Sequence, residues 1–556
     1  MTNATLEPRG TRTIPCFEPA TGRSLGEVAA HTPEDVRRMV ANARRAQEGF
    51  AHTSFETRRS VLKHILQHVL DHADELVELV VRDAGKTHEN AMMGEIWPVA
   101  EKLRWTIGNG EKHLRPERVS SGLFVHKKAS IEYVPRGVIG VICPWNYPLQ
   151  NILGPVIPAL MSGNASVVKV SEHVAWSAPR FQRIFDEALD AHGLSRDLVQ
   201  IVQGFGDVGA ALVSSGVDLV VFTGSMGNGK KVLAESAKTL VPVILELGGK
   251  DALVVCDDAE LEAAAHAALN GAFIAAGQNC LAAERILVMD GIYDRFVQRV
   301  TELARGLRQD VPTNRPGQVD VGALVTPQQL EIVEHLVSDA IAKGARALVG
   351  GKRANKPGSS TVRSPDGDTH VAAGRSTSGR LQNGNFFEPT VLVDVTPEMA
   401  VAQEEAFGPV LSILRVKDDA DAVRVANSTA YGLGCTVFSK DAARAKRIAD
   451  RIQSGSASIN DFGFTYMAQD LPFGGVGGSG FGRLNGREGL RACCHAKAVL
   501  EDRIALHAPA KVYPVKPHDA ELFRGVLRTL YGTGLSERVQ GLKDLAGTAS
   551  KLIRRR

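Results

Sequence analysis

Apolar residues near the start of the chain recur at the spacing of a helix. The segment 32–35 places Thr32 before a proline and two acids, and apolar residues follow at Val36, Val40 and Ala43. A capping residue, an early proline and first-turn acids are typical of a helix start, so this pattern predicts a helix that begins after Thr32. Farther on, the β-branched run at 134–143 predicts a buried strand.

Beyond that point, short apolar runs alternate with segments of helix length. Strands that alternate with helices form βαβ units, so the pattern predicts two successive α/β regions with parallel sheets. Such sheets bind ligands at the carboxyl ends of their strands. The expected strands are 134–143, 165–170, 198–202 and 218–222 in the first region and 252–256, 285–289, 387–393 and 434–438 in the second, with second-region helices at 261–275 and 327–343.

Two segments depart from this alternation. Residues 354–380 are rich in Gly, Ser and Thr and almost free of large apolar residues, which predicts a flexible surface insertion. Residues 521–556 carry eight Lys or Arg against three acids, and predict two short amphipathic helices that end in three arginines. These helices can lie on an anionic membrane or dock on the protein's own surface. Their apolar positions are Leu522, Phe523, Val526, Leu527 and Leu530, then Leu535, Val539, Leu542 and Leu545 after a break at Gly532 and Gly534.

Composition narrows the class of protein. At 556 residues the chain is too long for one core, and its 44% hydrophobic and 23% charged residues are ordinary globular values. A net charge of +3 is small for this length, so a nucleic-acid partner is not expected. The seven cysteines show no metal-ligand spacing, which speaks against a disulfide framework or a metal site and favours a reducing compartment. Neither a secretory signal nor an apolar run long enough to cross a membrane is visible, so a cytoplasmic location is expected.

Two short segments carry candidate reactive groups. Cys280 ends the sequence GQNC at 277–280, where a helix gives way to a loop beside a glycine, a place where a thiol can be exposed and activated. A buried structural cysteine is the alternative. Glu246 begins ELGGK at 246–250, directly after an apolar run, where a carboxylate can act as a general base. Taken singly, it can equally be a surface glutamate at a strand end.

Two further segments are candidates for binding an anion. The sequence FTGSMGNGK at 222–230 follows a strand and precedes a helix expected at 231–237, so its backbone N–H groups can face a phosphate. It matches neither GxGxxG nor the Walker pattern, and an ordinary glycine turn remains an alternative. Asn146, between prolines in PWNYP at 144–148, can hold its amide toward an oxyanion, although a rigid turn explains it equally well.

Taken together, these motifs resemble the aldehyde dehydrogenase superfamily, in the family's order, over about residues 35–507. The loop at 460–462 and the tail are similar to a plant and yeast branch of that family. Independent matches in register outweigh the alternatives for each single site. The motifs are PWNYP (144–148), KVSE (169–172), FTGS (222–225), ELGGK (246–250), GQNC (277–280), NFFEPT (385–390), EAFGPV (405–410), PFGG (472–475) and SGFGR (479–483).

The resemblance implies a hydrolytic, NAD(P)-dependent oxidation of an aldehyde to a carboxylic acid. In the family, Cys280 attacks the aldehyde carbon, Asn146 and the Cys280 backbone N–H hold the oxyanion, and Glu246 activates the water that hydrolyses the thioacyl-enzyme. An acid at Glu172 favours NAD, with NADP possible. Three departures from the usual motifs, Val170, Met226 and Gly477, remove no catalytic group, although Val170 can weaken the preference for NAD. The implied cofactor contacts are Trp145, Lys169, Glu172, Gly224, Ser225, Gly229, Leu247, Glu405 and Phe407.

The resemblance also implies the organisation of the chain and its partners. An NAD-binding domain is expected at 1–116 with 137–246, a catalytic domain at 247–476, an oligomerisation arm at 117–136 with 494–503, and a basic tail at 508–556. A homodimer or homotetramer is expected. Two alternatives stay open: a CoA-acylating aldehyde dehydrogenase, which has no need for Glu246, and a catalytically idle structural or membrane-associated relative. A medium-chain, long-chain or aromatic aldehyde is expected from a cluster of aromatic residues and one methionine, namely Tyr147, Phe462, Phe464, Tyr466, Met467 and Phe473.

Overall fold

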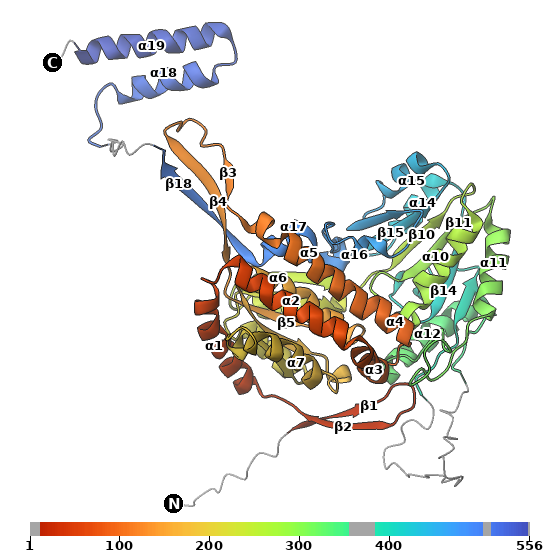
Figure 1. Cartoon of the computed structure of the whole chain (residues 1–556). Helices are drawn as coiled ribbons and strands as arrows, with labels where there is room; N and C mark the ends of the chain where they lie inside the picture. The colour runs from red at the N-terminus through yellow and green to blue at the C-terminus, as the bar shows by residue number, and fades with distance from the viewer. Residues whose placement is uncertain (1–11, 355–383, 504–512, 554–556) are drawn as a thin grey trace, which may run out of the picture. The chain divides into compact units, whose positions relative to one another are not determined.

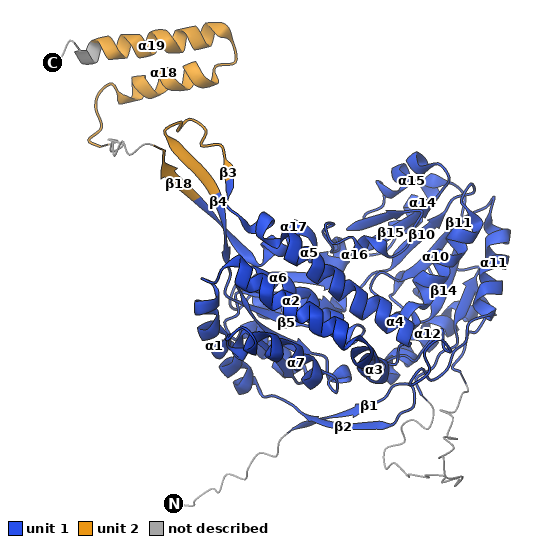
Figure 2. Cartoon of the chain, in the orientation of Figure 1, with its two compact units in different colours: residues 1–117, 131–498 blue, residues 118–130, 499–556 orange. Residues whose placement is uncertain are grey.

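The computed structural model describes residues 12–354, 384–503 and 513–553 (Figure 1). The chain divides into two compact units, residues 1–117 with 131–498 and residues 118–130 with 499–556 (Figure 2). Apart from Ala354, the insertion expected at 354–380 lies outside the described residues, as do the three terminal arginines.

The first large sheet of the main unit has six strands in the order β17-β9-β8-β5-β6-β7, all parallel except β17. Helices pack around it and close an apolar core (Figure 1). The strands are β5 (Val138–Ile142), β6 (Ala165–Val170), β7 (Val199–Gln203), β8 (Leu219–Gly224), β9 (Val243–Leu247) and β17 (Gly480–Phe481). The helices are α1 (Pro33–Phe50), α2 (Phe55–Asp71), α3 (Ala73–Ala84), α4 (His88–Ala91), the π-helix η1 (Met92–Ile96), α5 (Trp97–Leu114), α6 (Pro148–Met161), α7 (Ala178–Asp190), α8 (Gly206–Ser214) and α9 (Met226–Ser236), with short 3₁₀ turns η2 (Glu172–Val174) and η3 (Arg196–Leu198).

The second sheet has seven strands in the order β12-β13-β14-β11-β10-β15-β16, and β12 is its antiparallel edge. It encloses a separate apolar core. The strands are β10 (Asp251–Val255), β11 (Ala283–Met289), β12 (Arg346–Val349), β13 (Thr390–Val393), β14 (Val410–Val416), β15 (Gly434–Phe438) and β16 (Ser456–Ile459). The helices are α10 (Leu261–Phe273), η4 (Ile274–Gly277), α11 (Tyr293–Arg305), α12 (Pro327–Ala342), α13 (Ala400–Gln403), α14 (Asp419–Ala426), α15 (Ala442–Ala449) and α16 (Phe464–Met467). The 3₁₀ turn η5 (Gly477–Ser479) and α17 (Gly486–Ala492) follow in the chain but pack against β9 and α5 beside the first sheet.

Smaller elements complete the chain. β1 (Thr13–Phe17) and β2 (Ser24–Ala29) form an antiparallel pair. β3 (Glu117–Val119), β4 (Lys127–Pro135) and β18 (Cys494–Asp502) form a sheet in the order β18-β4-β3. Near the C-terminus, α18 (Asp519–Tyr531) and α19 (Leu535–Ile553) form a helical hairpin, as the apolar pattern of the tail predicts.

The predicted α/β fold is confirmed, and so is the helix after Thr32, whose side chain accepts a hydrogen bond from the Asp35 backbone N–H in a capping box. The single strand predicted at 134–143 is wrong. It is two strands in two sheets, because the chain turns at Gly137, whose φ of 131° favours glycine and whose N–H donates to Asn164.

Two predicted element starts are also wrong. The helix expected at 231–237 begins at Met226, because Ser225 caps it by accepting a hydrogen bond from the Asn228 backbone N–H. The strand expected at 387–393 begins at Thr390, immediately after Pro389, which has no N–H to donate to a neighbouring strand.

Candidate active site

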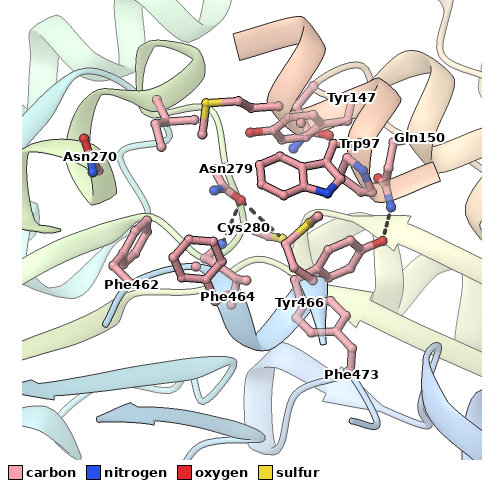
Figure 3. A pocket seen from close by; sticks show the side chains of 18 of the residues that line it. Trp97, Tyr147, Gln150, Asn270, Asn279, Cys280, Phe462, Phe464, Tyr466 and Phe473 are labelled. Carbon is pink, nitrogen blue, oxygen red and sulfur yellow. Dashed lines mark hydrogen bonds between the residues drawn. The ribbon is translucent and has the colours of Figure 1, made fainter. Parts of the chain in front are cut away.

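The three predicted catalytic residues meet in one pocket. Cys280 follows the turn η4, Glu246 lies on β9, and Asn146 lies in the loop between β5 and α6. All three line a cavity of about 450 Å³, and Figure 3 shows Cys280 among the rings of Phe464 and Tyr466 that line it. The sequence places these residues far apart, so their convergence is a finding of the fold.

The backbone before Cys280 is held in an uncommon conformation. Ala275, Ala276 and Gly277 all have positive φ values, of 52°, 55° and 75°. A Cβ on Gly277 would lie 2.0 Å from the Gly408 carbonyl oxygen, so only glycine fits there. Such a conformation persists only where its surroundings impose it, and it is common at functional sites.

Two side-chain amides hold this conformation, the half-buried Asn90 and the buried Gln278. The Ala275 N–H donates to Asn90 Oδ1 at 2.8 Å. Gln278 Nε2 donates to the Ala275 carbonyl at 2.9 Å, and Gln278 Oε1 accepts from the Val325 N–H at 2.9 Å. The turn that presents Cys280 is therefore fixed from both sides.

Glu246 is a buried carboxyl group whose Oε1 accepts no hydrogen bond from any residue that the structure describes. Burial raises the pKa of Glu246 to about 7, and the neighbouring Cys280 thiol partly opposes that rise. A carboxylate with a pKa near neutrality can take up and release a proton at working pH, which an ordinary glutamate does poorly.

The Cys280 thiol is partly buried and faces several acids. Burial, followed by the negative charge of Glu246, raises the pKa of Cys280 well above its usual value. The thiol is therefore protonated at rest and needs a base when it attacks a substrate. Glu246 is the nearby group suited to accept that proton.

The Asn146 side chain is buried and fixed in orientation. Its Oδ1 accepts a hydrogen bond from Asn151 Nδ2 at 3.2 Å, and its Nδ2 donates to the Gln278 carbonyl at 3.1 Å. Because the acceptor oxygen is already engaged by Asn151, the N–H₂ group faces the segment that carries Cys280. An oxyanion formed beside Cys280 would find a donor there.

The first group of predicted cofactor residues lies at the carboxyl ends of parallel strands. Lys169 on β6 forms a 3.2 Å ion pair with Glu172. Burial alone would raise the pKa of Glu172, but the adjacent Lys169 holds it below its usual value, so Glu172 is ionised at neutral pH. Gly224 ends β8, and Ser225 caps α9.

Gly229 has a packing role in the same place. A Cβ on Gly229 would lie 2.6 Å from Leu247 Cδ2, so the glycine lets α9 approach β9 closely. Ser225 and the first N–H groups of α9 are thereby held at the end of the sheet, where an anion can bind.

The second group surrounds Glu405. The Gly249 N–H donates to Glu405 Oε1 at 3.0 Å, and the rings of Trp145 and Phe407 meet edge to face with centroids 5.3 Å apart. Burial and the charge of Glu284 raise the pKa of Glu405 to about 8. The structure thus brings Glu405 to Gly249 of the ELGGK segment and Trp145 to Phe407.

Several residues that shape the site carry no local sequence signal. Glu284 accepts from the Ala406 and Phe407 N–H groups at 2.7 and 2.9 Å and forms a buried ion pair with Lys250. A similar pair, Lys86 with Glu95, lies under the Asn146 loop. Met93 in η1 and Trp97 in α5 also line the pocket, and neither segment has a recognisable motif.

In the part of the chain that the structure describes, no three His, Cys, Asp or Glu side chains lie together so that they could hold a metal ion. Among the same residues, none of the helices is long and apolar enough to cross a membrane.

Comparison with known proteins places these observations in a family. The aldehyde dehydrogenase family profile matches residues 6–366 and 363–499. An aldehyde dehydrogenase-like protein of Schizosaccharomyces pombe is 38% identical over 532 residues, covering 94% of this chain and 97% of the relative. The 4,4'-diapolycopene aldehyde oxidase of a Methylomonas species is 34% identical, covering 94% and 92%. A crystal structure of Staphylococcus aureus betaine aldehyde dehydrogenase in complex with NAD+ is 30% identical with a TM-score of 0.81, covering 92% of this chain and 95% of that one.

Proposed function

The chain belongs to the aldehyde dehydrogenase family and is an oxidoreductase that acts on aldehydes. From that premise we propose that it oxidises an aldehyde to a carboxylic acid with NAD, through a thioester on Cys280 that Glu246 helps to hydrolyse. The observation that carries the proposal is the convergence of Cys280, Glu246 and Asn146 on one pocket.

In the proposed reaction the Cys280 thiol adds to the aldehyde carbon, and Glu246 accepts the thiol proton. The new alkoxide accepts hydrogen bonds from Asn146 Nδ2 and the Cys280 backbone N–H. Bound NAD+ would accept the hydride that leaves the alkoxide carbon, and the carbonyl that re-forms is a thioester on Cys280. Glu246 first releases the thiol proton to solvent and then removes a proton from water. The resulting hydroxide displaces the Cys280 thiolate from the acyl carbon, and the acid leaves.

The residues present fit a dinucleotide. Ser225 and the N-terminus of α9 can hold its phosphates, and Glu405, beside Gly249 and Phe407, can hold its second ribose. Ionised Glu172 can accept hydrogen bonds from a ribose hydroxyl and would repel a 2′-phosphate, which favours NAD over NADP.

We propose a medium-chain, long-chain or aromatic aldehyde as substrate. The pocket wall around Cys280 is mostly apolar and aromatic, with Trp97, Phe464, Tyr466 and Phe473 prominent in Figure 3. The Methylomonas relative is named for an apolar aldehyde. In a series of straight-chain aldehydes, kcat/KM should rise as methylenes are added until the pocket is full, whereas a flat series would refute this substrate class.

Water, rather than coenzyme A, is the proposed acyl acceptor, because water attacks a thioester effectively only with the help of a base, and the buried Glu246 can supply one. The direct experiment is NADH formation across a broad panel of aldehydes without coenzyme A. Stoichiometric acid and NADH are expected. NADH formation only when coenzyme A is added would favour the acylating alternative, and NAD binding without any turnover would favour an idle relative.

We propose that segments 1–116 and 137–246 form the NAD-binding domain, 247–476 the catalytic domain, and 117–136 with 494–503 the oligomerisation arm of a dimer or tetramer. A strand-rich arm offers edges for pairing with another copy. Light scattering after size-exclusion chromatography is expected to give two or four times the chain mass, and a monomer at micromolar concentration would contradict this assignment.

We further propose that the C-terminal hairpin makes peripheral contact with an anionic membrane. α18 and α19 pack closely through small residues, since a Cβ on Gly541 would lie 2.4 Å from the Thr529 nitrogen. The hairpin therefore leaves large apolar side chains outside: Phe523 is 59% exposed and Leu535 is 82% exposed. The sequence from 521 to 556 carries eight Lys or Arg against three acids, a basic balance that suits anionic lipid.

The membrane proposal is tested by sedimentation with vesicles. The full chain is expected to pellet with phosphatidylserine-containing vesicles and much less with neutral ones, while a chain truncated after His507 should stay in the supernatant with both. Equal behaviour of the two chains would refute the proposal. If the full chain does not bind vesicles and truncation lowers the melting temperature, the result would favour docking of the hairpin on the protein's own surface.

A further inference from the structure

A buried ion pair lies directly beneath the loop that carries Asn146. Lys86 Nζ donates to Glu95 Oε1 at 2.8 Å, and both side chains are almost completely buried. We infer that Lys86 and Glu95 are a positioning pair that fixes the Asn146 amide for the oxyanion, an inference that rests on the proposed function. Neither residue lines the pocket, so each would act through the loop.

Glu95 holds the segment after Asn146. Its Oε2 accepts hydrogen bonds from the Leu149 N–H at 3.1 Å and from the Gln150 N–H at 2.8 Å, both in the first turn of α6. That turn contains no acid of its own. Glu95 therefore supplies, from another element, the negative charge that a helix N-terminus favours.

Lys86 holds Asn146 itself. Its Nζ donates to the Asn146 backbone carbonyl at 2.7 Å and lies 3.7 Å from the centroid of the Tyr147 ring. One ammonium group thus contacts Glu95, Asn146 and Tyr147. The carbonyl of Asn146 and the two N–H groups after Pro148 are bound to the same ion pair, so the loop is held at Asn146 itself and again at the start of α6.

The local backbone is shaped for this contact. Glu95 belongs to the π-helix η1 (Met92–Ile96), and such single turns are frequent at functional sites. The preceding residue is Gly94, where a Cβ would lie 2.5 Å from the Tyr147 ring. The glycine lets η1 lie against the Asn146 loop, which brings the Glu95 carboxylate to the start of α6.

Stability alone does not account for the pair. Burial lowers the pKa of Lys86 and raises the pKa of Glu95, and the charge of each partner opposes these shifts. Replacing a buried ion pair by apolar residues of similar size is often neutral or stabilising. A positioning role explains why the charges converge on this loop.

The experiment is a double-mutant cycle between Glu95→Gln and Asn146→Ala, read by single-turnover NADH formation. Glu95→Gln is expected to slow that step about 10- to 100-fold, less than loss of a whole oxyanion donor, while KM for the aldehyde and the Kd for NADH change less than about twofold. In the Asn146→Ala background the same substitution should change the rate less than about twofold, because its effect passes through Asn146.

The control is Asp83→Asn, which removes another buried carboxylate, one that accepts from the Ser177 N–H and hydroxyl. It should lower the melting temperature without coupling to Asn146. If Glu95→Gln does not fold, the neutral pair Lys86→Met with Glu95→Gln enters the same cycle, because it leaves no uncompensated charge.

Equal losses from Glu95→Gln in the two backgrounds would overturn the inference, as would a wild-type rate in Glu95→Gln. These outcomes differ from a failure of the proposed function, in which the wild-type protein itself forms no NADH with any aldehyde.

Discussion

The pKa of Glu246 gives the proposed mechanism a quantitative consequence for pH dependence. Burial raises this pKa to about 7, and only the ionised carboxylate can accept a proton from Cys280 or from water. Below its pKa the ionised fraction falls tenfold per pH unit. Between pH 8 and pH 5 it falls from about nine tenths to about one hundredth, so kcat/KM should fall roughly 90-fold, with an inflection near pH 7.

The assay compares initial rates of NADH formation from pH 5 to pH 9 in the wild-type protein, Glu246→Gln and Asp83→Asn. Asp83 is the matched control, because burial raises its pKa to about 7 as well, yet it does not line the pocket. Asp83→Asn should keep the inflection, and Glu246→Gln should lose it together with most of the turnover. A flat wild-type profile down to pH 5, or an unchanged inflection in Glu246→Gln, would refute the assignment of the base.

The same pKa predicts a change in stability. Because the pKa of Glu246 is higher in the folded protein than in the unfolded chain, the folded state binds this proton more tightly. The stabilisation from this proton binding is complete below about pH 4.5 and is lost as pH rises through about 7. A rise from 4.5 to about 7 corresponds to about 3 kcal/mol of lost stability at alkaline pH. In chemical denaturation, the free energy of unfolding of the wild-type protein should be lower at pH 8 than at pH 5. In Glu246→Gln this part of the difference between the two pH values should be absent. A variant that is as pH-sensitive as wild type would contradict it.

Three further predictions concern cofactor and substrate. Glu172→Gln removes an ionised acid and should lower the ratio of NAD to NADP kcat/KM roughly tenfold, and an unchanged ratio would argue that Glu172 does not meet the ribose. Glu284→Gln weakens the anchor of the Ala406 and Phe407 N–H groups and should raise the Kd for NAD about tenfold by fluorescence titration. An unchanged Kd would show that this anchor is not needed. Trp97→Ala widens the pocket from a half-exposed position, so it should favour bulkier aldehydes in kcat/KM while the melting temperature changes little. A shift in melting temperature alone would count against the pocket assignment.

The sequence predicts features whose cause is local. Thr32 caps α1 as predicted, because a short polar side chain precedes the first turn, and β6 and β15 begin and end where their apolar runs do. Cys280, Glu246 and Asn146 were found through motifs that resemble a known family, and the fold places them in one pocket.

Features that depend on distant contacts escape such reasoning. Glu95 reaches Leu149 only because η1 forms a π-helix and Gly94 leaves space for Tyr147, and neither cause is visible in the local sequence. The run at 134–143 is rich in β-branched residues and reads as one strand, yet Gly137 divides it between two sheets. In the tail, the apolar spacing predicts helices but not which face is covered, because Gly541 and Thr529 decide how the helices pack.

The central claim is a covalent thioester on Cys280, and the most direct measurement is the intact mass of the wild-type protein mixed with NAD and hexanal and quenched in acid within the first turnover, followed by peptide mapping. The other six cysteines are buried, so an adduct in the folded protein should report on Cys280 alone. We predict one hexanoyl group per chain, located on Cys280 and absent from Cys280→Ser. NADH formation without an adduct, or turnover by Cys280→Ser, would contradict the mechanism.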